Sequence, residues 1–241
     1  MTIPTGPLPV PASVREIAGG DDVQPVWVNE LGGTTFRVDG DTGPTYVKVS
    51  PGSLADEAER LRWAGRYVAV PQVIGVGPGG SWLHTAGLPG RSAVDPHWLT
   101  QPLVAARAIG VGLRTLHDRL PVSSCPFDWS VGRRLAQAAP SARADLSEPP
   151  PVDKLVVCHG DACAPNTILD DDGRYRGHVD FGDLGTADRW ADLAVASLSL
   201  GWNYPDASTE PVFFAAYGIE PDELRIDYYR RLWDAGDVPS G

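Results

Sequence analysis

The chain carries one run from which most of its architecture can be inferred, Val156-Val157-Cys158-His159-Gly160-Asp161-Ala162-Cys163-Ala164-Pro165-Asn166, and a second short motif follows it, Val179-Asp180-Phe181-Gly182. Asp161 comes soon after an apolar strand, a carboxamide follows at Asn166, and Asp180 ends the next apolar run. Between the two motifs, residues 170–173 have the composition of a hairpin turn that leads into a strand over residues 175–179. We therefore expect both carboxylates to face one cleft.

These three side chains form the minimal set for metal-assisted phosphoryl transfer. That reaction needs a group that orients or deprotonates the acceptor hydroxyl, and magnesium ions that bridge the phosphates and neutralise developing charge. Asp161 fits the first role. Asn166 and Asp180 fit the second, because Mg²⁺ prefers oxygen ligands and keeps several of its waters. The pattern predicts a kinase.

Two alternative roles for this run remain open. Asp and Asn most often make local turns in loops, so Asp161 and Asn166 could be ordinary turn residues. The ordered series from His159 to Asp180 argues against this, because each match requires one residue type at one offset. A metal site built from Cys158, His159 and Cys163 is the second alternative, although these spacings match no zinc pattern and no second pair occurs in the sequence.

The pattern His159-Gly160-Asp161-Ala162-Cys163-x-Pro165-Asn166 resembles the catalytic loop of the aminoglycoside 3'-phosphotransferases, the kanamycin and neomycin kinases. The general kinase-like pattern needs only His-x-Asp and a later Asn, so the added Ala-Cys and Pro favour this branch. The resemblance runs from about Val28 to Asp234. It implies an α/β (α+β) protein-kinase-like fold of two lobes, with a small β-rich nucleotide-binding lobe (residues 1–86) and a larger, mainly helical catalytic and substrate-binding lobe (residues 87–241).

In the first lobe the resemblance implies a nucleotide-binding loop. Residues 28–38 are predicted to form a strand, a turn over Leu31 to Thr35, and a second strand. Small residues let a backbone approach an anion, so the loop candidates are Gly32, Gly33, Thr34 and Thr35. A Gly-Gly pair between strands is more often only a hairpin turn, which is the alternative.

Lys48 is the single cation in an otherwise apolar strand over residues 45–49, and the matching lysine of the family contacts the nucleotide phosphates. A lysine on an edge strand that reaches into water is the alternative. The family holds its lysine with a glutamate on the next helix, which is predicted here over residues 54–67 with Ser53 as N-cap. Alignment selects Glu57 as the partner and Glu59 as the fallback. Ala86 and Leu88 correspond to the hinge, where main-chain groups bind the adenine.

Four residues are candidates for contacts with the acceptor: Asp183, Trp202, Asn203 and Asp234. Several relatives carry Arg in place of Asp183, near the acceptor. Well-known members have adjacent acids that hold substrate amines where this chain has Trp202 and Asn203. The substrate is then either held differently, with a sugar packed on the aromatic face, or is another compound; an ordinary core role is the alternative for Trp202. Asp234 matches the position of a terminal acid that members place on the acceptor.

Composition and charge restrict the partners. The 241 residues are 42% hydrophobic and 21% charged, as in ordinary globular proteins, and the formal net charge is −11. That charge argues against a nucleic-acid partner and suits a cationic small molecule. No apolar run approaches the roughly 20 residues that cross a bilayer, and no secretory signal begins the sequence. We expect a cytoplasmic protein without a membrane partner, as a monomer or weak dimer.

The rest of the second lobe is predicted to be mainly helical. Residues 100–120 have apolar side chains at helical spacing, and His117 near the end is expected to be a surface or capping residue. Four prolines in residues 140–151 predict a loop. A further helix is expected from Asp192 to Leu200, with Asp188 as its cap and the pair of Asp188 with Arg189 bracing the lobe.

The three cysteines are too few, and odd in number, for a disulfide framework. Cys158 and Cys163 flank the catalytic run, where they could be taken for nucleophiles. No separate Cys-His base arrangement is indicated, so we expect both to be small buried packing residues.

The motifs predict Mg²⁺-dependent phosphoryl transfer, and the resemblance implies that ATP phosphorylates a hydroxyl of an aminoglycoside antibiotic, the 3'-OH, as a resistance activity. A kinase for another small hydroxyl compound, such as a macrolide, a choline-like amine or a metabolite, is the neighbouring alternative. A nucleotide-binding pseudokinase that senses a cationic ligand is an alternative from another class. The complete set of Lys48, Glu57, Asp161, Asn166 and Asp180 argues against it, since a sensor has no need of every chemical part.

Overall fold

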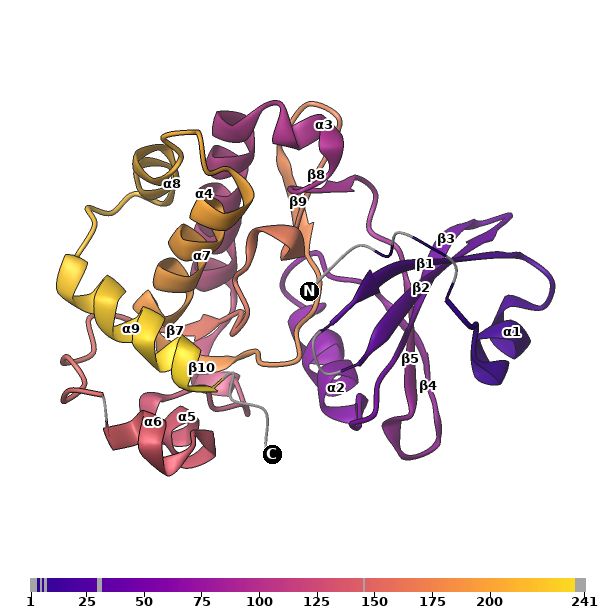
Figure 1. Cartoon of the computed structure of the whole chain (residues 1–241), viewed down its shortest axis with the longest axis horizontal. Coiled ribbons are helices and arrows are strands. Elements are labelled where there is room, and N and C mark those ends of the chain that lie inside the picture. Colours follow the sequence, from indigo (N-terminus) through magenta and orange to yellow (C-terminus); the bar gives the residue numbers. More distant parts are fainter. Residues whose placement is uncertain (1–3, 5, 7, 30–31, 145, 237–241) are drawn as a thin grey trace. The chain divides into compact units, whose positions relative to one another are not determined.

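The computed structural model describes residues 4, 6, 8–29, 32–144 and 146–236. The chain separates into two compact units, one made of residues 1–66 and 70–88 and the other of residues 67–69 and 89–241. In Figure 1 the strands of the first unit are indigo to purple, and the helices of the second run from magenta to yellow.

The first unit is built on a five-stranded antiparallel sheet with the order β1-β2-β3-β5-β4. Inward side chains at alternate strand positions, Phe36, Val38 and Val47, form its core with Val14. Val14 comes from a short helix that precedes the sheet. The elements are α1 (Ala12–Ala18), β1 (Asp22–Val28), β2 (Thr34–Gly40), β3 (Gly43–Val49), β4 (Val73–Val76), the 3-10 turn η1 (Pro78–Gly80) and β5 (Trp82–Ala86).

Helix α2 (Ala55–Ala64) belongs to the same unit and buries Leu61 and Trp63. Acids lie in its first turn and Arg62 in its last, the order that the helix dipole favours. The expected N-cap is wrong by one residue, because Leu54 occupies that position while Ser53 Oγ accepts the N–H of Ala55 at 3.3 Å. The helix also ends earlier than predicted, at Ala64.

The second unit is mainly helical. In Figure 1, helix α4 lies beside α8 and α7 lies beside α9, and these are its most extensive helix contacts. Gly110 permits the first of these contacts, because a Cβ there would come within 2.5 Å of the Phe213 carbonyl oxygen. The helices are α3 (Pro96–Leu99), α4 (Pro102–Arg119), α5 (Val131–Gln137), α6 (Pro140–Ala144), α7 (Trp190–Asn203), α8 (Glu210–Tyr217) and α9 (Glu223–Gly236), with 3-10 turns η2 (Val122–Ser124) and η3 (Ala164–Asn166).

Two small antiparallel sheets position the segments that carry the candidate site. Strand β7 (Leu155–Cys158) pairs with β10 (Gly185–Asp188), while β8 (Thr167–Leu169) pairs with both β9 (Tyr175–His178) and β6 (Arg91–Ser92). The predicted turn between β8 and β9 is confirmed: Gly173 has φ 76°, and Asp170 Oδ1 accepts the N–H groups of Asp172 and Arg174. The loop after β7 therefore ends where a hairpin begins.

One expected helix is confirmed, and three other expected features need adjustment. The helix over residues 100–120 is α4. The helix expected from Asp192 is α7, which begins at Trp190. Asp188 Oδ1 accepts the N–H of Trp190 at 3.2 Å, although Arg189 occupies the N-cap position. The loop predicted over residues 140–151 is wrong for its first part, since α6 starts with Pro140, and proline is tolerated in the first turn of a helix.

None of the helices in the described part of the chain is both long and apolar enough to cross a membrane.

Candidate active site

Asp161 and Asn166 contact each other directly in the loop after β7. Asn166 Nδ2 donates to the Asp161 carbonyl oxygen at 2.9 Å and to Asp161 Oδ2 at 3.0 Å. These bonds fix the orientation of the amide, so that its Oδ1 points away from Asp161. Asp161 Oδ1 is buried, and no described residue donates a hydrogen bond to it. Each side chain thus keeps one oxygen for a ligand, and a buried oxygen without a partner is costly unless something binds it.

Burial and the nearby negative charge of Asp180 raise the pKa of Asp161. A hydrogen bond from Cys163, the nearby His159 and the hydrogen bond from Asn166 lower this pKa without reversing the shift. The two carboxylates are therefore close enough to repel each other. A divalent cation held by Asp180 and the Asn166 amide oxygen would offset that repulsion, so the donor set fits Mg²⁺.

Asp180 has φ 63°, and it is the sole non-glycine residue with a positive φ in the part of the chain that the structure describes. A left-handed conformation costs a residue with a side chain about 1 to 3 kcal/mol, and such strain is concentrated at functional sites. Just before it, the N–H of Val179 donates to the Asn166 carbonyl oxygen at 2.9 Å. This bond brings the segment that carries Asp180 against the catalytic loop.

His159 is a positioning residue in this loop. Its Nδ1 accepts the N–H of Asp161 at 3.2 Å, and its Nε2 donates to the Val179 carbonyl oxygen at 2.9 Å. A nitrogen that accepts cannot also carry a proton, so the hydrogen bonds assign the tautomer with the proton on Nε2. The ring is fully buried and joins the backbone of Asp161 to that of Val179.

Asp192 on α7 anchors the loop by hydrogen bonds to its backbone. Sequence reasoning missed this role. Its Oδ2 accepts the N–H of His159 at 2.6 Å and lies 2.9 Å from His117 Nε2, while its Oδ1 accepts the N–H of Gly160 at 3.0 Å. Burial alone would raise the pKa of Asp192, but the hydrogen bond from His117, with His159 and its backbone N–H, holds it below its ordinary value. The sequence did contain a signal for this role, because Asp192 is an acid in the first turn of an otherwise apolar helix.

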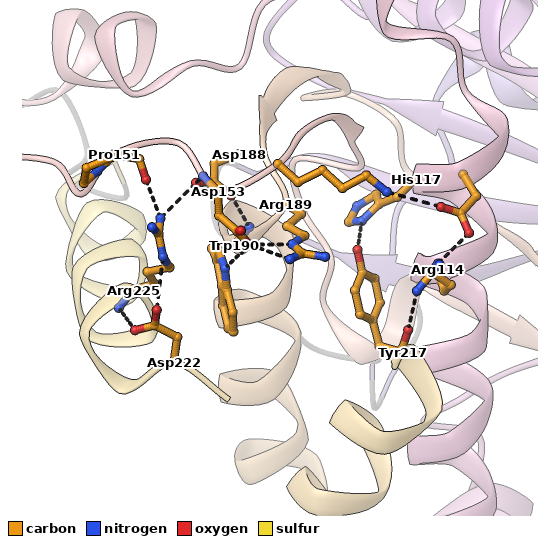
Figure 2. A network of polar contacts seen from close by, with 12 residues as sticks. Arg114, His117, Pro151, Asp153, Asp188, Arg189, Trp190, Tyr217, Asp222 and Arg225 are labelled. Atoms are coloured by element: carbon orange, nitrogen blue, oxygen red, sulfur yellow. Dashed lines mark hydrogen bonds and ion pairs between the residues drawn. The ribbon is translucent and has the colours of Figure 1, made fainter. Parts of the chain in front are cut away.

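His117 is buried, so the expectation of a surface or capping residue is wrong. The ring lies between α7 and α8, with Nδ1 2.9 Å from the Tyr217 hydroxyl (Figure 2) and Nε2 facing Asp192. It shares a face of α4 with the buried Leu113 and Leu116. That pattern could have indicated a satisfied core histidine.

Asp183 lies against the catalytic loop through its backbone. Gly160 has φ 90°, and a Cβ on it would come within 2.2 Å of the Asp183 carbonyl oxygen, so only glycine fits there. The charge of Asp183 also acts on Arg134, a buried residue on α5: burial lowers the pKa of Arg134, and Asp183 opposes the shift. Asp183 therefore partly offsets the cost of burying the Arg134 guanidinium.

Lys48 and Glu57 pair within the first unit. Lys48 Nζ lies 2.9 Å from Glu57 Oε2, with 19% and 8% of the two side chains exposed. Glu59 is exposed on the same helix. Lys48 lies on β3 opposite Thr35, so the register of the strand pairing sets its position along the strand.

The predicted phosphate loop is organised as a turn around Asn29. Gly33 donates its N–H to Asn29 Oδ1 at 2.6 Å, and Gly32 donates to the Asn29 carbonyl oxygen at 3.2 Å. Thr34 and Thr35 belong to β2 and not to the turn, which corrects the expected boundary; Leu31 lies outside the described residues. The N–H groups of both glycines thus form hydrogen bonds within the turn.

Ala86 and Leu88 are near the end of the first unit. The N–H of Ala86 donates to the Gln72 carbonyl oxygen at 2.9 Å, so only its carbonyl could serve a ligand. Gly87, between them, donates to the Pro44 carbonyl oxygen. The sequence indicated these positions for their main chains, and only the Ala86 carbonyl and the backbone of Leu88 remain as candidates.

The remaining acceptor candidates lie at helix ends. Trp202 is 58% exposed near the end of α7, so it is not an ordinary core residue. Asn203 Nδ2 donates to the Ser199 carbonyl oxygen at 2.8 Å and lies 3.2 Å from Ser199 Oγ, which accepts the N–H of Ala164. Asn203 is therefore connected to the catalytic loop through Ser199. Asp234 is exposed on α9.

Cys158 and Cys163 are buried, as expected, and Cys125 is half-buried. Burial, with the charges of Asp192 and Asp188, raises the pKa of the Cys158 thiol, which donates to the Asp188 carbonyl oxygen. Both ring nitrogens of His159 are already hydrogen-bonded. The alternative of a metal site at Cys158, His159 and Cys163 therefore has neither a thiolate at Cys158 nor a histidine nitrogen with a lone pair to spare.

Asp188 and Arg189 each brace the unit, with different partners, as Figure 2 shows. Arg189 Nη2 lies 2.6 Å from Asp153 Oδ2, which also accepts the Trp190 indole N–H. Asp188 Oδ2 accepts the N–H of Asp153 and lies 3.3 Å from Arg225 Nη1 on α9. The network joins the segment before β7 to α7 and α9.

The chain is similar to known phosphotransferases. A family described as "Phosphotransferase enzyme family" matches residues 130–229. An aminoglycoside 3'-phosphotransferase from Streptomyces ribosidificus is 33% identical over 247 residues, covering 85% of this chain and 92% of the relative. The crystal structure of an aminoglycoside-3'-phosphotransferase of type VIII is 30% identical, with a TM-score of 0.77, and covers 92% of this chain and 97% of that one.

A further solved structure, an aminoglycoside phosphotransferase from Streptomyces rimosus in complex with ADP and streptomycin, is 28% identical with a TM-score of 0.71. The match covers 92% of this chain and 96% of that one. The predicted α/β protein-kinase-like fold, with a β-rich part and a mainly helical part, is confirmed by these similarities.

Proposed function

The chain belongs to the phosphotransferase enzyme family that includes the aminoglycoside 3'-phosphotransferases, and from this we propose that it transfers the γ-phosphoryl group of ATP to the 3'-hydroxyl of an aminoglycoside. One observation carries the proposal: Asp161 Oδ1 is buried without a hydrogen-bond donor among the described residues, beside an amide that Asp161 itself orients. A related enzyme with bound ADP and streptomycin supports the nucleotide and the class of acceptor.

In the proposed reaction, Asp161 Oδ1 accepts a hydrogen bond from the acceptor hydroxyl. As the hydroxyl oxygen bonds to the γ-phosphorus, the bond from phosphorus to the β–γ bridging oxygen breaks and ADP leaves. The hydroxyl proton passes to Asp161 and then to solvent. The raised pKa of Asp161 makes its carboxylate a stronger base than an ordinary aspartate.

Asn166 Oδ1 and Asp180 are the oxygen donors that would hold Mg²⁺. When bound, the ion neutralises charge on the phosphates. Asp192 and His159 keep the loop in the conformation that presents Asp161. We assign phosphate contacts to Lys48, held by Glu57, and adenine contacts to Ala86 and Leu88, so that residues 1–86 form the nucleotide-binding part and residues 87–241 the catalytic part.

The acceptor contacts are assigned to Asp183, Trp202, Asn203 and Asp234. The net charge of −11 suits a polycationic drug, because opposite charge raises the local concentration of a ligand. The exposed face of Trp202 can pack on a sugar or attract an amine. The cytoplasm, where ATP is available, is the compartment we assign to the reaction.

The test is ADP release by the purified protein with Mg-ATP and a panel of acceptors: kanamycin, neomycin, a 3'-deoxy aminoglycoside, streptomycin and a macrolide. Turnover with kanamycin or neomycin, lost with the 3'-deoxy compound and in Asp161→Ala, is the expected result. Turnover with streptomycin alone, or with the macrolide alone, would reject the 3'-position and name a different acceptor. ATP binding without turnover on any compound would reject catalysis of this reaction and favour the sensor.

A further inference from the structure

The second unit contains a hollow of about 490 Å³ that is separate from Asp161, Asn166 and Asp180. It lies along helix α4, with the β8–β9 hairpin as the other wall. Pockets of roughly 300 to 1,000 Å³ are the usual size for small-molecule sites. The site already described leaves this hollow without a role.

Four arginines line the hollow: Arg107, Arg119, Arg174 and Arg176. Their concentration is unexpected in a chain whose formal net charge is −11. None of Arg107, Arg119 and Arg176 forms a salt bridge with a carboxylate in the described residues, whereas Arg174 Nη1 lies 2.7 Å from Asp172 Oδ2. That pair is largely exposed, at 75% and 69%, and exposed pairs are weak enough for an arginine to exchange its partner.

The spacing of residues on α4 places one stripe toward the hollow. Arg107, Val111, Thr115 and Arg119 follow one another at intervals of four, which puts them on a single helical face. The Thr115 hydroxyl donates to the Val111 carbonyl oxygen at 2.7 Å, so its hydrogen is used within the helix. Arg107 and Arg119 are thus the two end residues of this stripe.

The opposite wall is held firmly against the helix. Tyr175 on β9 packs on Gly112, where a Cβ would come within 2.7 Å of its ring, and its hydroxyl lies 2.9 Å from His178 Nδ1. At the hairpin turn, a Cβ on Gly173 would meet Val104 at 2.4 Å. Arg119 and Tyr175 both line the hollow, from α4 and from β9. The hollow is therefore formed before any ligand arrives.

The lining combines these cations with apolar surface from Val68, Ala69, Ala108 and Val111, next to the Tyr175 ring. Guanidinium groups bind phosphate oxygens through paired hydrogen bonds, and the apolar floor that these residues form can accept a ring. We propose that this hollow binds a small organic phosphate, with the phosphate on the arginines and an aromatic or other apolar group against α4 and Tyr175.

Charge excludes the other ligands considered for this chain. A polycationic acceptor would be repelled by four guanidinium groups, so the hollow is not a second drug site. Nucleic acid is bound by extended basic surfaces, and the chain as a whole is acidic. A compact basic pocket on an acidic protein selects a small anion.

The test uses calorimetric titration with 1-naphthyl phosphate at low ionic strength, above the second phosphate pKa of about 6. The variants are Arg107→Ala with Arg119→Ala, and Arg174→Ala with Arg176→Ala. Arg133→Ala, which replaces an exposed arginine on α5 outside the hollow, is the matched control, and Lys48→Ala reports binding at the proposed nucleotide site. Exposed arginines are replaced, so thermal melting should show all variants folded.

We expect one molecule bound per chain, with affinity about tenfold or more lower in each double variant and unchanged in Arg133→Ala and Lys48→Ala. Added salt should weaken binding, and inorganic phosphate should bind more weakly because it cannot use the apolar floor. The absence of binding, equal affinity in the double variants, or loss of binding only in Lys48→Ala would overturn the proposal. Inorganic phosphate that bound as tightly as the naphthyl ester would overturn the assigned class of ligand.

Discussion

His117 Nε2 on α4 lies 2.9 Å from Asp192 Oδ2 on α7, and both side chains are fully inaccessible to solvent. The same carboxylate accepts the backbone N–H groups of His159 and Gly160. One buried anion thus joins two helices to the loop that carries Asp161, and the conformation of that loop depends on it.

Asp192→Asn should destabilise the protein by about 3 kcal/mol or more, because one amide oxygen cannot serve the three N–H donors that the carboxylate accepts. Turnover should fall as well, since the loop loses its anchor. Urea unfolding and ADP release measure the two effects. Asp227→Asn is the control: its pair with Arg231 is about 60% exposed, and its loss should cost less than about 1 kcal/mol. Equal destabilisation in the two variants would contradict the role of Asp192.

Asp161→Asn should lower turnover by about 10²- to 10⁴-fold, the usual contribution of a general base, while increasing stability at neutral pH. Because the folded state raises the pKa of Asp161, the ionised carboxylate opposes folding above that pKa, and this cost disappears below the ordinary value of 3.8. The stability gain of the variant should therefore vanish in acid. Unfolding from pH 7 to 3 tests the sign, and a variant less stable than the natural protein at pH 7 would refute it.

Lys48→Ala and Glu57→Ala should both lower kcat/KM for ATP, and the double variant should be no worse than Lys48→Ala alone. Glu57 acts by holding Lys48 at 2.9 Å, so it has nothing to position once the amine is gone. The coupling energy in the double-mutant cycle should be about 0.5 to 3 kcal/mol. Glu59→Ala, on the exposed face of α2, is the matched control and should be silent. Additive losses would mean that Glu57 has a separate function.

Trp202→Ala should raise KM for the acceptor while leaving KM for ATP and the melting temperature unchanged. An exposed indole contributes little to the core, and contact with a cation is worth about 0.5 to 2 kcal/mol, or about a 2- to 30-fold change in KM. Leu224→Ala, which removes a side chain that is 84% exposed, is the control. An unchanged acceptor KM in Trp202→Ala would remove Trp202 from the substrate site.

Two glycines in helices should respond to alanine with opposite signs. Gly110→Ala should destabilise by about 1 to 3 kcal/mol, because the new Cβ would lie 2.5 Å from the Phe213 carbonyl oxygen and α8 must move. Gly201→Ala on α7 meets nothing within 4 Å and should stabilise by about 0.5 to 1 kcal/mol through the loss of backbone freedom in the unfolded chain. Thermal unfolding of both variants measures the difference.

The sequence was informative where the chemistry is local. Asp161 and Asn166 are five residues apart on one loop, and the hairpin that follows returns the chain to Asp180, so spacing alone brought them together. Asp192 and His117 are 75 residues apart and meet only because α4 packs beside α7. Periodicity showed that each lay on a helix, but it did not give the rotation of one helix relative to the other.

The sequence also predicted the ends of helices and strands less well than their existence. The four prolines of residues 140–151 predicted a loop, yet Pro140 has no helical N–H to lose at the start of α6. Thr34 and Thr35 were grouped with the glycines by their size, although β-branched residues favour the strand in which the structure has them.

The burial of two cysteines makes the local unfolding of the catalytic segment measurable. Cys158 at the end of β7 and Cys163 in the loop are shielded from solvent, whereas Cys125 is half-buried. A disulfide reagent should therefore modify Cys125 first and reach the other two only when the segment opens. In a Cys125→Ser background, the rate of thiol modification would report how often the loop unfolds locally, and any ligand that holds Asp161 or Asn166 should slow it.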